Sequence, residues 1–198
     1  MLVTSARFAE SREPPAIDLA AVRPYSVENA FASPFTRTGD WFVLHTRSRQ
    51  EKALALDLEA RQISYFLPLR REIRYYGKRK CVVDAPLFSN YLFIRGCASD
   101  AYIADRTKRV ANIIRCPDQR RISWELQNIN LSLLQGAPLA LYPFLVKGTR
   151  VEVRAGPFRG LQGIIEDCIK GNRLILQVET LGQALSFEID GSLLDAIE

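Results

Sequence analysis

The chain has 198 residues, of which 47% are hydrophobic, and a net charge of +5 at pH 7. This length suits one or two domains, and the hydrophobic fraction is enough for packed cores. No segment approaches the roughly 20 apolar residues of a membrane-spanning helix. Charged residues also interrupt the N-terminus, where a signal peptide would be apolar, so we expect a cytoplasmic protein.

Charge and proline are distributed unevenly along the chain. Residues 1–39 contain four of the ten prolines and no sustained periodicity, which predicts a flexible N-terminal extension. Residues 40–135 carry 17 basic and 10 acidic side chains, a net charge of +7, whereas residues 147–198 carry 6 and 8, a net charge of −2. The middle part is therefore the candidate to meet nucleic acid.

The first folded domain is predicted over residues 40–135. An aromatic and β-branched run favours a strand at 41–46. The next residues favour a helix that Ser48 caps and that places Glu51, Leu54, Ala55, Leu58 and Gln62 on one face. Strands are predicted at 64–76, bent at Pro68, and at 81–84, 90–95 and 110–115, with helices at about 100–106 and 123–134, the second capped by Ser123. Strands mixed with helices indicate an α+β domain.

The segment "NYLFIR" is apolar on both faces of its predicted strand. Because side chains alternate along a strand, Tyr91 and Phe93 point one way, and Leu92 and Ile94 the other. One face can pack on the core of the domain. The second face needs a covering helix, another sheet or a partner protein.

A second, all-β domain is predicted at the end of the chain. Residues 136–146 contain two prolines and little charge, which indicates a linker. From residue 147 to residue 198, short strands alternate with glycine-containing turns, and this pattern is typical of a small barrel. The strands are predicted at 150–153, 162–169, 173–179 and 184–189.

The sequence offers little for catalysis or metal binding. Cys81, Cys97, Cys116 and Cys168 are far apart, and His45 is the single histidine, so neither a zinc site nor a disulfide framework is indicated. There is no phosphate-binding glycine loop and no nucleophile motif. We therefore expect a protein that is not an enzyme and that uses no cofactor and no metal.

Two motifs resemble those of a known family. The segment "KGTRVEVRAGPFRGLQGIIEDCIKGNRLILQV" resembles a KOW motif, with its loop at Gly156, Pro157, Phe158, Gly160 and Gly163. The earlier segments "WFVLHTRSRQEKALALDLEARQI", "FLPL" and "PLFSNYLFI" resemble the N-terminal domain of the NusG family of bacterial transcription factors. Asn90, where housekeeping NusG typically has glycine, brings the chain closer to the specialised RfaH-like members.

The resemblance implies an architecture and a polymerase-binding surface. The fold would be an α+β domain with an antiparallel sheet flanked by helices, followed by an SH3-like KOW barrel. In the family, an apolar face of the first domain binds the clamp coiled coil of the RNA polymerase β′ subunit, and the domain also reaches the β lobe. Phe88, Tyr91 and Phe93 occupy the corresponding positions. The alternative is that these aromatic side chains fill the core of their own domain.

Basic residues fall into two groups with a predicted role in nucleic-acid binding. A hairpin group, interleaved with Tyr75 and Tyr76, suits phosphates and stacked bases of a single strand, unless it is merely solvated. It comprises Arg70, Arg71, Arg74, Lys78, Arg79 and Lys80. By resemblance, a second group lies where relatives touch the non-template DNA strand: Arg47, Arg49, Arg61, Lys108 and Arg109. Asp57 departs from that pattern, because a relative has a basic or aromatic side chain there.

The predicted function is transcription elongation and antitermination on selected operons, through binding of RNA polymerase by a monomer. By resemblance, the KOW domain would meet ribosomal protein NusE or Rho factor through Leu181 and Gly182. Some specialised relatives hold this domain as a helical hairpin, but its glycines and β-branched residues predict a permanent barrel here. The alternative function is a KOW-type RNA- or ribosome-binding protein that acts in translation.

Overall fold

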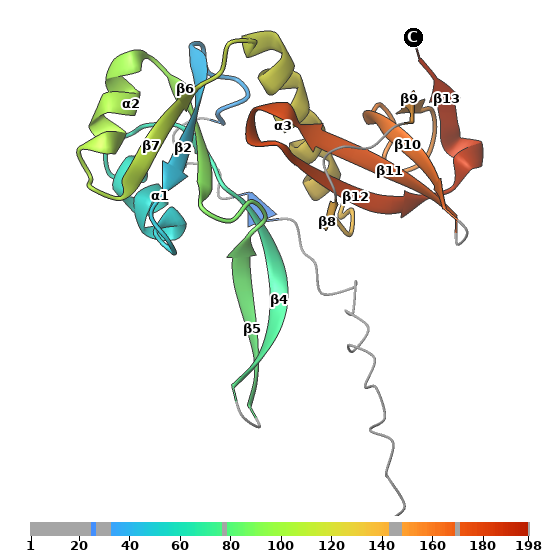
Figure 1. The fold of residues 1–198 in the computed structure, drawn as a ribbon, viewed down its shortest axis with the longest axis horizontal. Coiled ribbons are helices and arrows are strands. Elements are labelled where there is room, and N and C mark those ends of the chain that lie inside the picture. Colours follow the sequence, from blue (N-terminus) through green and yellow to red (C-terminus); the bar gives the residue numbers. More distant parts are fainter. Residues whose placement is uncertain (1–24, 27–32, 77–78, 143–147, 169–170, 198) are drawn as a thin grey trace, which may run out of the picture.

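The computed structural model describes residues 25–26, 33–76, 79–142, 148–168 and 171–197. Its first domain is built on an antiparallel sheet with the strand order β3–β6–β2–β7. The strands are β2 (Asp40–Thr46), β3 (Tyr65–Phe66), β6 (Tyr91–Gly96) and β7 (Val110–Arg115). Figure 1 shows this sheet with helices α1 and α2 on one side and α3 on the other.

Helices α1 (Glu51–Glu59) and α2 (Ala98–Asp105) cover one face of the sheet. The predicted apolar stripe of α1 is confirmed, because Glu51, Leu54, Ala55 and Leu58 are buried, but Gln62 lies beyond the helix. The predicted Ser48 cap is wrong: α1 begins after Gln50, which makes no side-chain capping hydrogen bond. The Glu51 carboxylate instead accepts a hydrogen bond from the backbone N–H of Asn90, at 2.7 Å.

Asn90 has a positive φ of 67°. Asparagine and glycine both tolerate this left-handed conformation better than other residues. Asn90 lies in the turn before β6, and its left-handed backbone explains why asparagine or glycine suits position 90.

Helix α3 (Gln119–Leu134) is longer than predicted. The prediction that Ser123 caps it is wrong, because Asp118 is the N-cap and its side chain accepts a hydrogen bond from the backbone N–H of Arg121. The extra turn brings Arg120 and Arg121 into the start of the helix. Basic residues there are unusual, because the positive end of the helix dipole disfavours them.

A two-stranded ribbon, β4 (Pro68–Tyr76) and β5 (Arg79–Pro86), projects from the body of the molecule (Figure 1). Its base pairs with β1 (Tyr25–Ser26), which lies in the predicted N-terminal extension. Phe35, also from this segment, contacts the rings of Trp41 and Phe66 at centroid distances of 5.5 and 5.1 Å. Parts of the extension therefore have defined contacts, whereas residues 1–24 and 27–32 lie outside the described residues.

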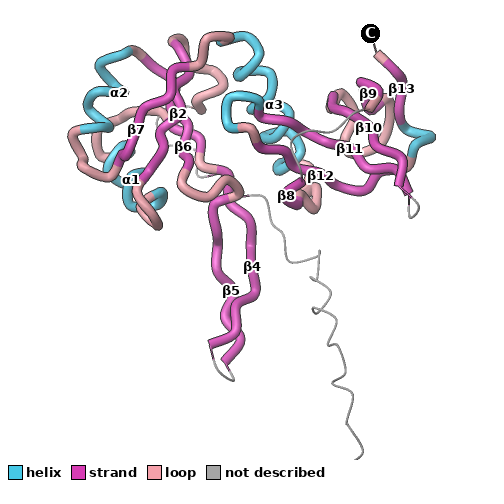
Figure 2. The backbone as a smooth tube through the Cα atoms, in the orientation of Figure 1, coloured by secondary structure: helices cyan, strands magenta, loops and turns pink. Residues whose placement is uncertain are grey.

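The C-terminal part forms an antiparallel sheet with the described order β13–β9–β10–β11–β12–β8. Its strands are β8 (Ala140–Tyr142), β9 (Thr149–Val153), β10 (Gln162–Cys168), β11 (Gly171–Val178), β12 (Gln183–Ile189) and β13 (Leu194–Ala196). Two short 3₁₀ helices, η2 (Glu179–Leu181) and η3 (Gly191–Leu193), follow β11 and β12. Figure 2 shows the predominance of strand in this part. Closure of the sheet into a KOW barrel remains a prediction.

The structure differs from the predicted linker, residues 136–146, in one respect. β8 pairs with β12 through Ala140 to Tyr142, so this stretch belongs to the C-terminal sheet. Ala137 and Leu139 are buried. Residues 143–146 of the predicted linker lie outside the described residues.

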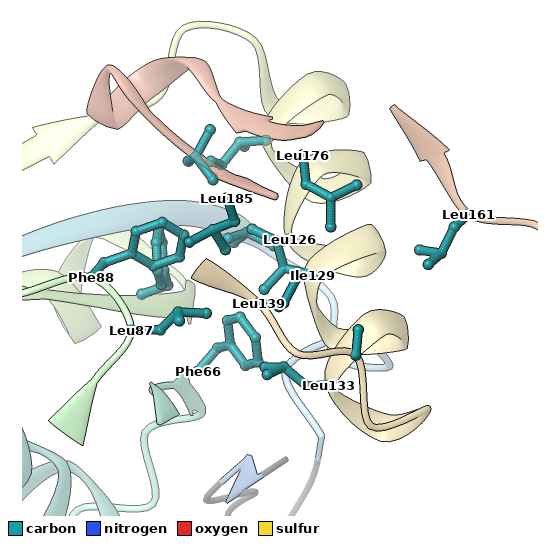
Figure 3. Close-up of a cluster of buried hydrophobic side chains, with 14 of the residues drawn as sticks. Phe66, Leu87, Phe88, Leu126, Ile129, Leu133, Leu139, Leu161, Leu176 and Leu185 are labelled. Atoms are coloured by element: carbon teal, nitrogen blue, oxygen red, sulfur yellow. The ribbon is translucent and has the colours of Figure 1, made fainter. Parts of the chain in front are cut away.

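The two faces of the first sheet belong to different hydrophobic clusters. Phe42, Leu44, Leu92 and Ile94 pack with α1 and α2. On the opposite face, Trp41, Val43 and Phe93 share one cluster with α3 and with leucines of the C-terminal sheet. Figure 3 shows this second cluster, in which Phe66, Leu87 and Phe88 lie near side chains of α3 and Leu185 of β12.

Candidate functional site

The predicted polymerase-binding aromatics lie at the second of these clusters. Phe88 and Phe93 are 1% and 0% exposed and meet edge to face, with ring centroids 5.9 Å apart. Tyr91 is half-buried and stacks on His45 at 5.1 Å. In this arrangement α3 and the C-terminal sheet cover the face that was predicted to need a cover. Contact of this face with polymerase stays a prediction, and it requires these rings to be uncovered.

Polar side chains of α3 bind the backbone of the C-terminal domain. The buried carboxylate of Glu125 accepts hydrogen bonds from the backbone N–H of Glu179 at 3.2 and 3.3 Å. One turn later, the side-chain oxygen of Asn128 accepts from the backbone N–H of Gln162 at 3.0 Å. Arg121 completes the set with ion pairs to Glu125 at 3.2 Å and to Glu179 at 2.5 Å. These contacts fix the C-terminal domain in one position along α3.

Two titratable groups at this interface have shifted pKa values. Burial raises the pKa of Glu125 above its ordinary value, and the hydrogen bonds from Glu179 and Arg121 oppose that rise. Burial likewise raises the pKa of the Cys116 thiol to about 11, against a hydrogen bond with Thr180. Because a thiolate is the reactive form of cysteine, the raised pKa should make alkylation of Cys116 slow while the two domains are in contact.

Acidic side chains partly neutralise the basic hairpin. Glu72 forms ion pairs with both Arg70 and Arg74, the latter at 3.0 Å. Asp84 lies 3.6 Å from Arg71. Tyr75 is 61% exposed and available for stacking. Lys78 lies outside the described residues, as do the side chains of Tyr76, Arg79 and Lys80.

The second basic group is dispersed around α1 and β7. Arg47, Arg49 and Lys108 are exposed, whereas Arg61 donates to the backbone carbonyl of Asp57 at 2.7 Å. Arg109 is also bound: it pairs with the Asp57 carboxylate at 2.7 Å and donates to Gln50. The departure from the family pattern at Asp57 therefore has a structural counterpart, because Asp57 engages one of the predicted DNA-binding arginines.

The glycine loop has the backbone expected for it. Gly156 and Gly160 have φ values of 82° and 86°. Phe158 packs against Phe187 with ring centroids 4.9 Å apart. Gly163 is required for a different reason, because a Cβ atom there would lie 2.5 Å from the backbone oxygen of Ile175. Pro157 is exposed in the same loop.

The predicted partner-binding loop faces the first domain. Gly182 has a left-handed backbone, and Leu181 is half-buried against the cluster shared by the two domains. The neighbouring Glu179 carries the contacts with α3 described above. A partner that uses Leu181 would therefore compete with α3 in this arrangement.

Other kinds of site find no support in the part of the chain that the structure describes. No group of histidine, cysteine and acidic residues there could hold a metal ion. Among the same residues, no helix is both long enough and apolar enough to cross a membrane. Cys81, Cys97 and Cys116 are free thiols.

Sequence reasoning missed the role of α3. The helix was expected to be an ordinary flanking element, and Glu125, Asn128 and Arg121 were not singled out. One signal was present: charged and amide side chains at positions 121, 125 and 128 share a helical face. That spacing gives no information about which domain the face would meet.

Comparison with known proteins agrees with this architecture. Residues 39–129 match the NusG family model, which is described as transcription termination factor nusG. The match spans β2 to the first eleven residues of α3. A search of curated proteins found no match. Residues 39–129, slightly less than half of the chain, are therefore similar to the NusG family domain.

Proposed function

We propose that the protein is a transcription elongation and antitermination factor that binds RNA polymerase and suppresses pausing or termination on selected operons. The observation that carries this proposal is the NusG match over residues 39–129, which contain Phe88, Tyr91 and Phe93 on one sheet face. The protein acts by binding and performs no catalysis. It is a monomer that needs no cofactor, and its RfaH-like specialisation is part of the proposal.

The proposed mechanism begins with separation of the two domains. Movement of the C-terminal sheet away from α3 would uncover the side chains around Phe88 and Tyr91, which then bind the β′ clamp coiled coil while the domain reaches the β lobe. The same movement releases Leu181 and Gly182 for NusE or Rho. The exposed basic residues, Arg47, Arg49 and Lys108 with the hairpin, would face the non-template DNA strand.

The test is affinity purification of the full chain from cell extract. Recovery of the β and β′ subunits is expected, whereas recovery of ribosomal RNA without them would favour the RNA- or ribosome-binding alternative. Tyr91→Ala should weaken polymerase binding about tenfold or more, because aromatic anchors at an interface often contribute about 2 kcal/mol. Tyr102→Ala on α2, where the side chain is 64% exposed, is the matched control. Equal polymerase binding by both variants would show that Tyr91 is not part of the polymerase interface.

The basic hairpin is tested separately by salt dependence. Replacement of Arg71 and Arg74 by alanine should reduce the salt dependence of binding to a transcription complex, by a slope of roughly 0.7 for each single-strand phosphate that is no longer neutralised. An unchanged salt slope would show that Arg71 and Arg74 contact no phosphate. Their charges would then be neutralised by water and by the ion pairs with Asp84 and Glu72.

A further inference from the structure

A cavity lies between α3 and the C-terminal sheet, on the side of the helix that bears Trp124. Its volume is about 650 Å³, within the range of small-molecule sites. α3 supplies Arg120, Arg121 and Trp124, and β9 supplies Arg150. The opposite wall, from the C-terminal domain, combines the amide side chains of Gln162 and Gln177 with a set of apolar side chains: Ile164, Ile175, Leu176 and Ile197.

Positive charge dominates the polar lining of this cavity. Arg120, Arg121 and Arg150 face a single acidic lining residue, Glu125. Glu125 and Arg121 satisfy each other and also bind Glu179. Among the described residues, no ion pair engages Arg120 or Arg150, and both are exposed. Two guanidinium groups are therefore available to an anion from opposite domains.

Trp124 places an aromatic ring beside these charges. The Arg150 guanidinium carbon lies 5.8 Å from the centroid of the Trp124 ring. The ring also lines a second hollow of about 380 Å³, which it shares with Arg120, Gln119 and Gln127. Planar rings stack on tryptophan and on guanidinium groups. The site thus combines a stacking surface, apolar side chains and two guanidinium groups.

We infer that this cavity binds a nucleotide, with its base against Trp124 and the apolar side chains and its phosphate between Arg120 and Arg150. The position of Arg120 supports this assignment. It lies in the first turn of α3, where the helix dipole disfavours a cation but favours a bound anion. The shared chemistry fits a free nucleotide or one nucleotide unit of a single strand.

Such a ligand would contact both domains at once. A molecule that binds only the closed arrangement stabilises it by mass action, so the nucleotide would hold the C-terminal sheet on α3. This binding is independent of the proposed polymerase contact and can be tested with the protein alone.

The test is calorimetric titration of the full-length protein with AMP, adenosine, inorganic phosphate and a six-nucleotide oligoadenylate. We expect AMP to bind more tightly than adenosine or phosphate. Arg120→Ala and Arg150→Ala should each weaken AMP binding about tenfold or more, since each removes a charge-assisted contact. Arg159→Ala is the control. Arg159 is an exposed arginine of the C-terminal domain, like Arg150, but it lines neither hollow, so this variant should bind AMP with unchanged affinity.

The remaining outcomes decide between sources or overturn the inference. An oligoadenylate that binds far more tightly than AMP would identify a strand as the source, whereas equal affinity would identify a free nucleotide. Saturating AMP should also slow alkylation of Cys116, which a merely adventitious phosphate contact would not do. Phosphate affinity equal to that of AMP, no binding of AMP or oligoadenylate, or unchanged binding by Arg150→Ala would each overturn the inference.

Discussion

The two faces of the β3–β6–β2–β7 sheet are buried by different means. On one face, Leu44, Leu92 and Ile94 meet α1 and α2 in a cluster that lies within the first domain. On the other face, Phe93 shares its cluster with α3 and with leucines of the C-terminal sheet. The second interface also contains buried polar groups, Glu125 and Asn128, that bind backbone N–H groups of the C-terminal domain.

This difference indicates which interface can open. Apolar burial stabilises without directional constraint, whereas a buried polar group must find its partner or incur a desolvation cost. Glu125 and Asn128 would regain water as partners if the C-terminal sheet moved away, because both lie where the domains meet. The α1/α2 face packs within a single domain, so disruption of its packing should unfold the first domain.

The largest expected effect is on the α1/α2 face. Leu54→Ala should lower the free energy of unfolding of the first domain by about 2–5 kcal/mol, because Leu54 is fully buried. Leu56→Ala on the same helix, where the side chain is 68% exposed, should change it by no more than about 0.5 kcal/mol. Chemical denaturation of both variants measures the difference, and similar decreases would show that α1 packs differently from this description.

The second prediction addresses the other face through Glu125. Glu125→Ala leaves the backbone N–H of Glu179 without its acceptor and removes one of the two ion-pair partners of Arg121. We expect the contact between the domains to weaken by about 1–3 kcal/mol, with little change in the unfolding of the first domain. Alkylation of Cys116, which is buried at this interface, should become about tenfold faster.

Cys97 provides the internal control for that measurement, because it is exposed in the same protein and its labelling should not change. With a pKa of about 11, Cys116 has roughly one thiolate per thousand molecules at pH 8 even before burial limits access. Glu59→Ala on α1 is the matched control variant. Equal Cys116 labelling in the Glu125 and Glu59 variants would contradict the assigned role of Glu125.

The strands were more predictable from the sequence than the helix starts. Strand 110–115 was predicted at its observed bounds because β-branched residues and the flanking charges define it. The helix starts were wrong at Ser48 and Ser123 because capping preference is local, whereas α1 begins where Glu51 can reach Asn90. Likewise, Asp118 and Gln119 extend α3, and Gln119 bonds the backbone of Trp41 at 2.7 and 3.0 Å. Contacts between residues so far apart in the sequence produce no periodic pattern from which a helix start could be predicted.

The candidate site was predictable only in part. The alternation of Tyr91 and Phe93 correctly placed them on a face that needs a cover, because alternation is a property of the strand alone. The identity of the cover was not predictable, since it depends on how two domains meet. The cavity was not predictable for the same reason. Arg120 and Trp124 lie on α3 and Arg150 lies on β9, and no spacing in the sequence indicates that they meet.

The third prediction is a pH dependence of the domain contact. The pKa of Glu125 is raised by burial when the domains touch, so the closed arrangement holds the proton more tightly than separated domains do. Protonation of Glu125 therefore stabilises the closed arrangement. This stabilisation is fully present at pH values below 4.5, the ordinary pKa of a glutamate, and is lost as the pH rises through the raised pKa of Glu125. Nitrogen relaxation by NMR should therefore show the domains tumbling together more as pH falls toward 4.5. Glu125→Gln should remove this trend, and an equal trend in that variant would assign it to other groups.

The smallest effect is expected at the exposed edge of the same interface. Arg121 and Glu179 lie 2.5 Å apart, but their side chains are 49% and 52% exposed. Ion pairs open to solvent contribute about 0–1 kcal/mol and weaken with salt. Glu179→Gln keeps the backbone N–H that binds Glu125, so Cys116 labelling should rise by less than about fivefold, and the rise should vanish at 1 M salt. Glu188→Gln, which breaks the exposed pair with Arg173 at 3.7 Å, is the control and should leave labelling unchanged. An effect of Glu179→Gln as large as that of Glu125→Ala would show that charge at the rim, rather than the buried carboxylate, holds the domains together.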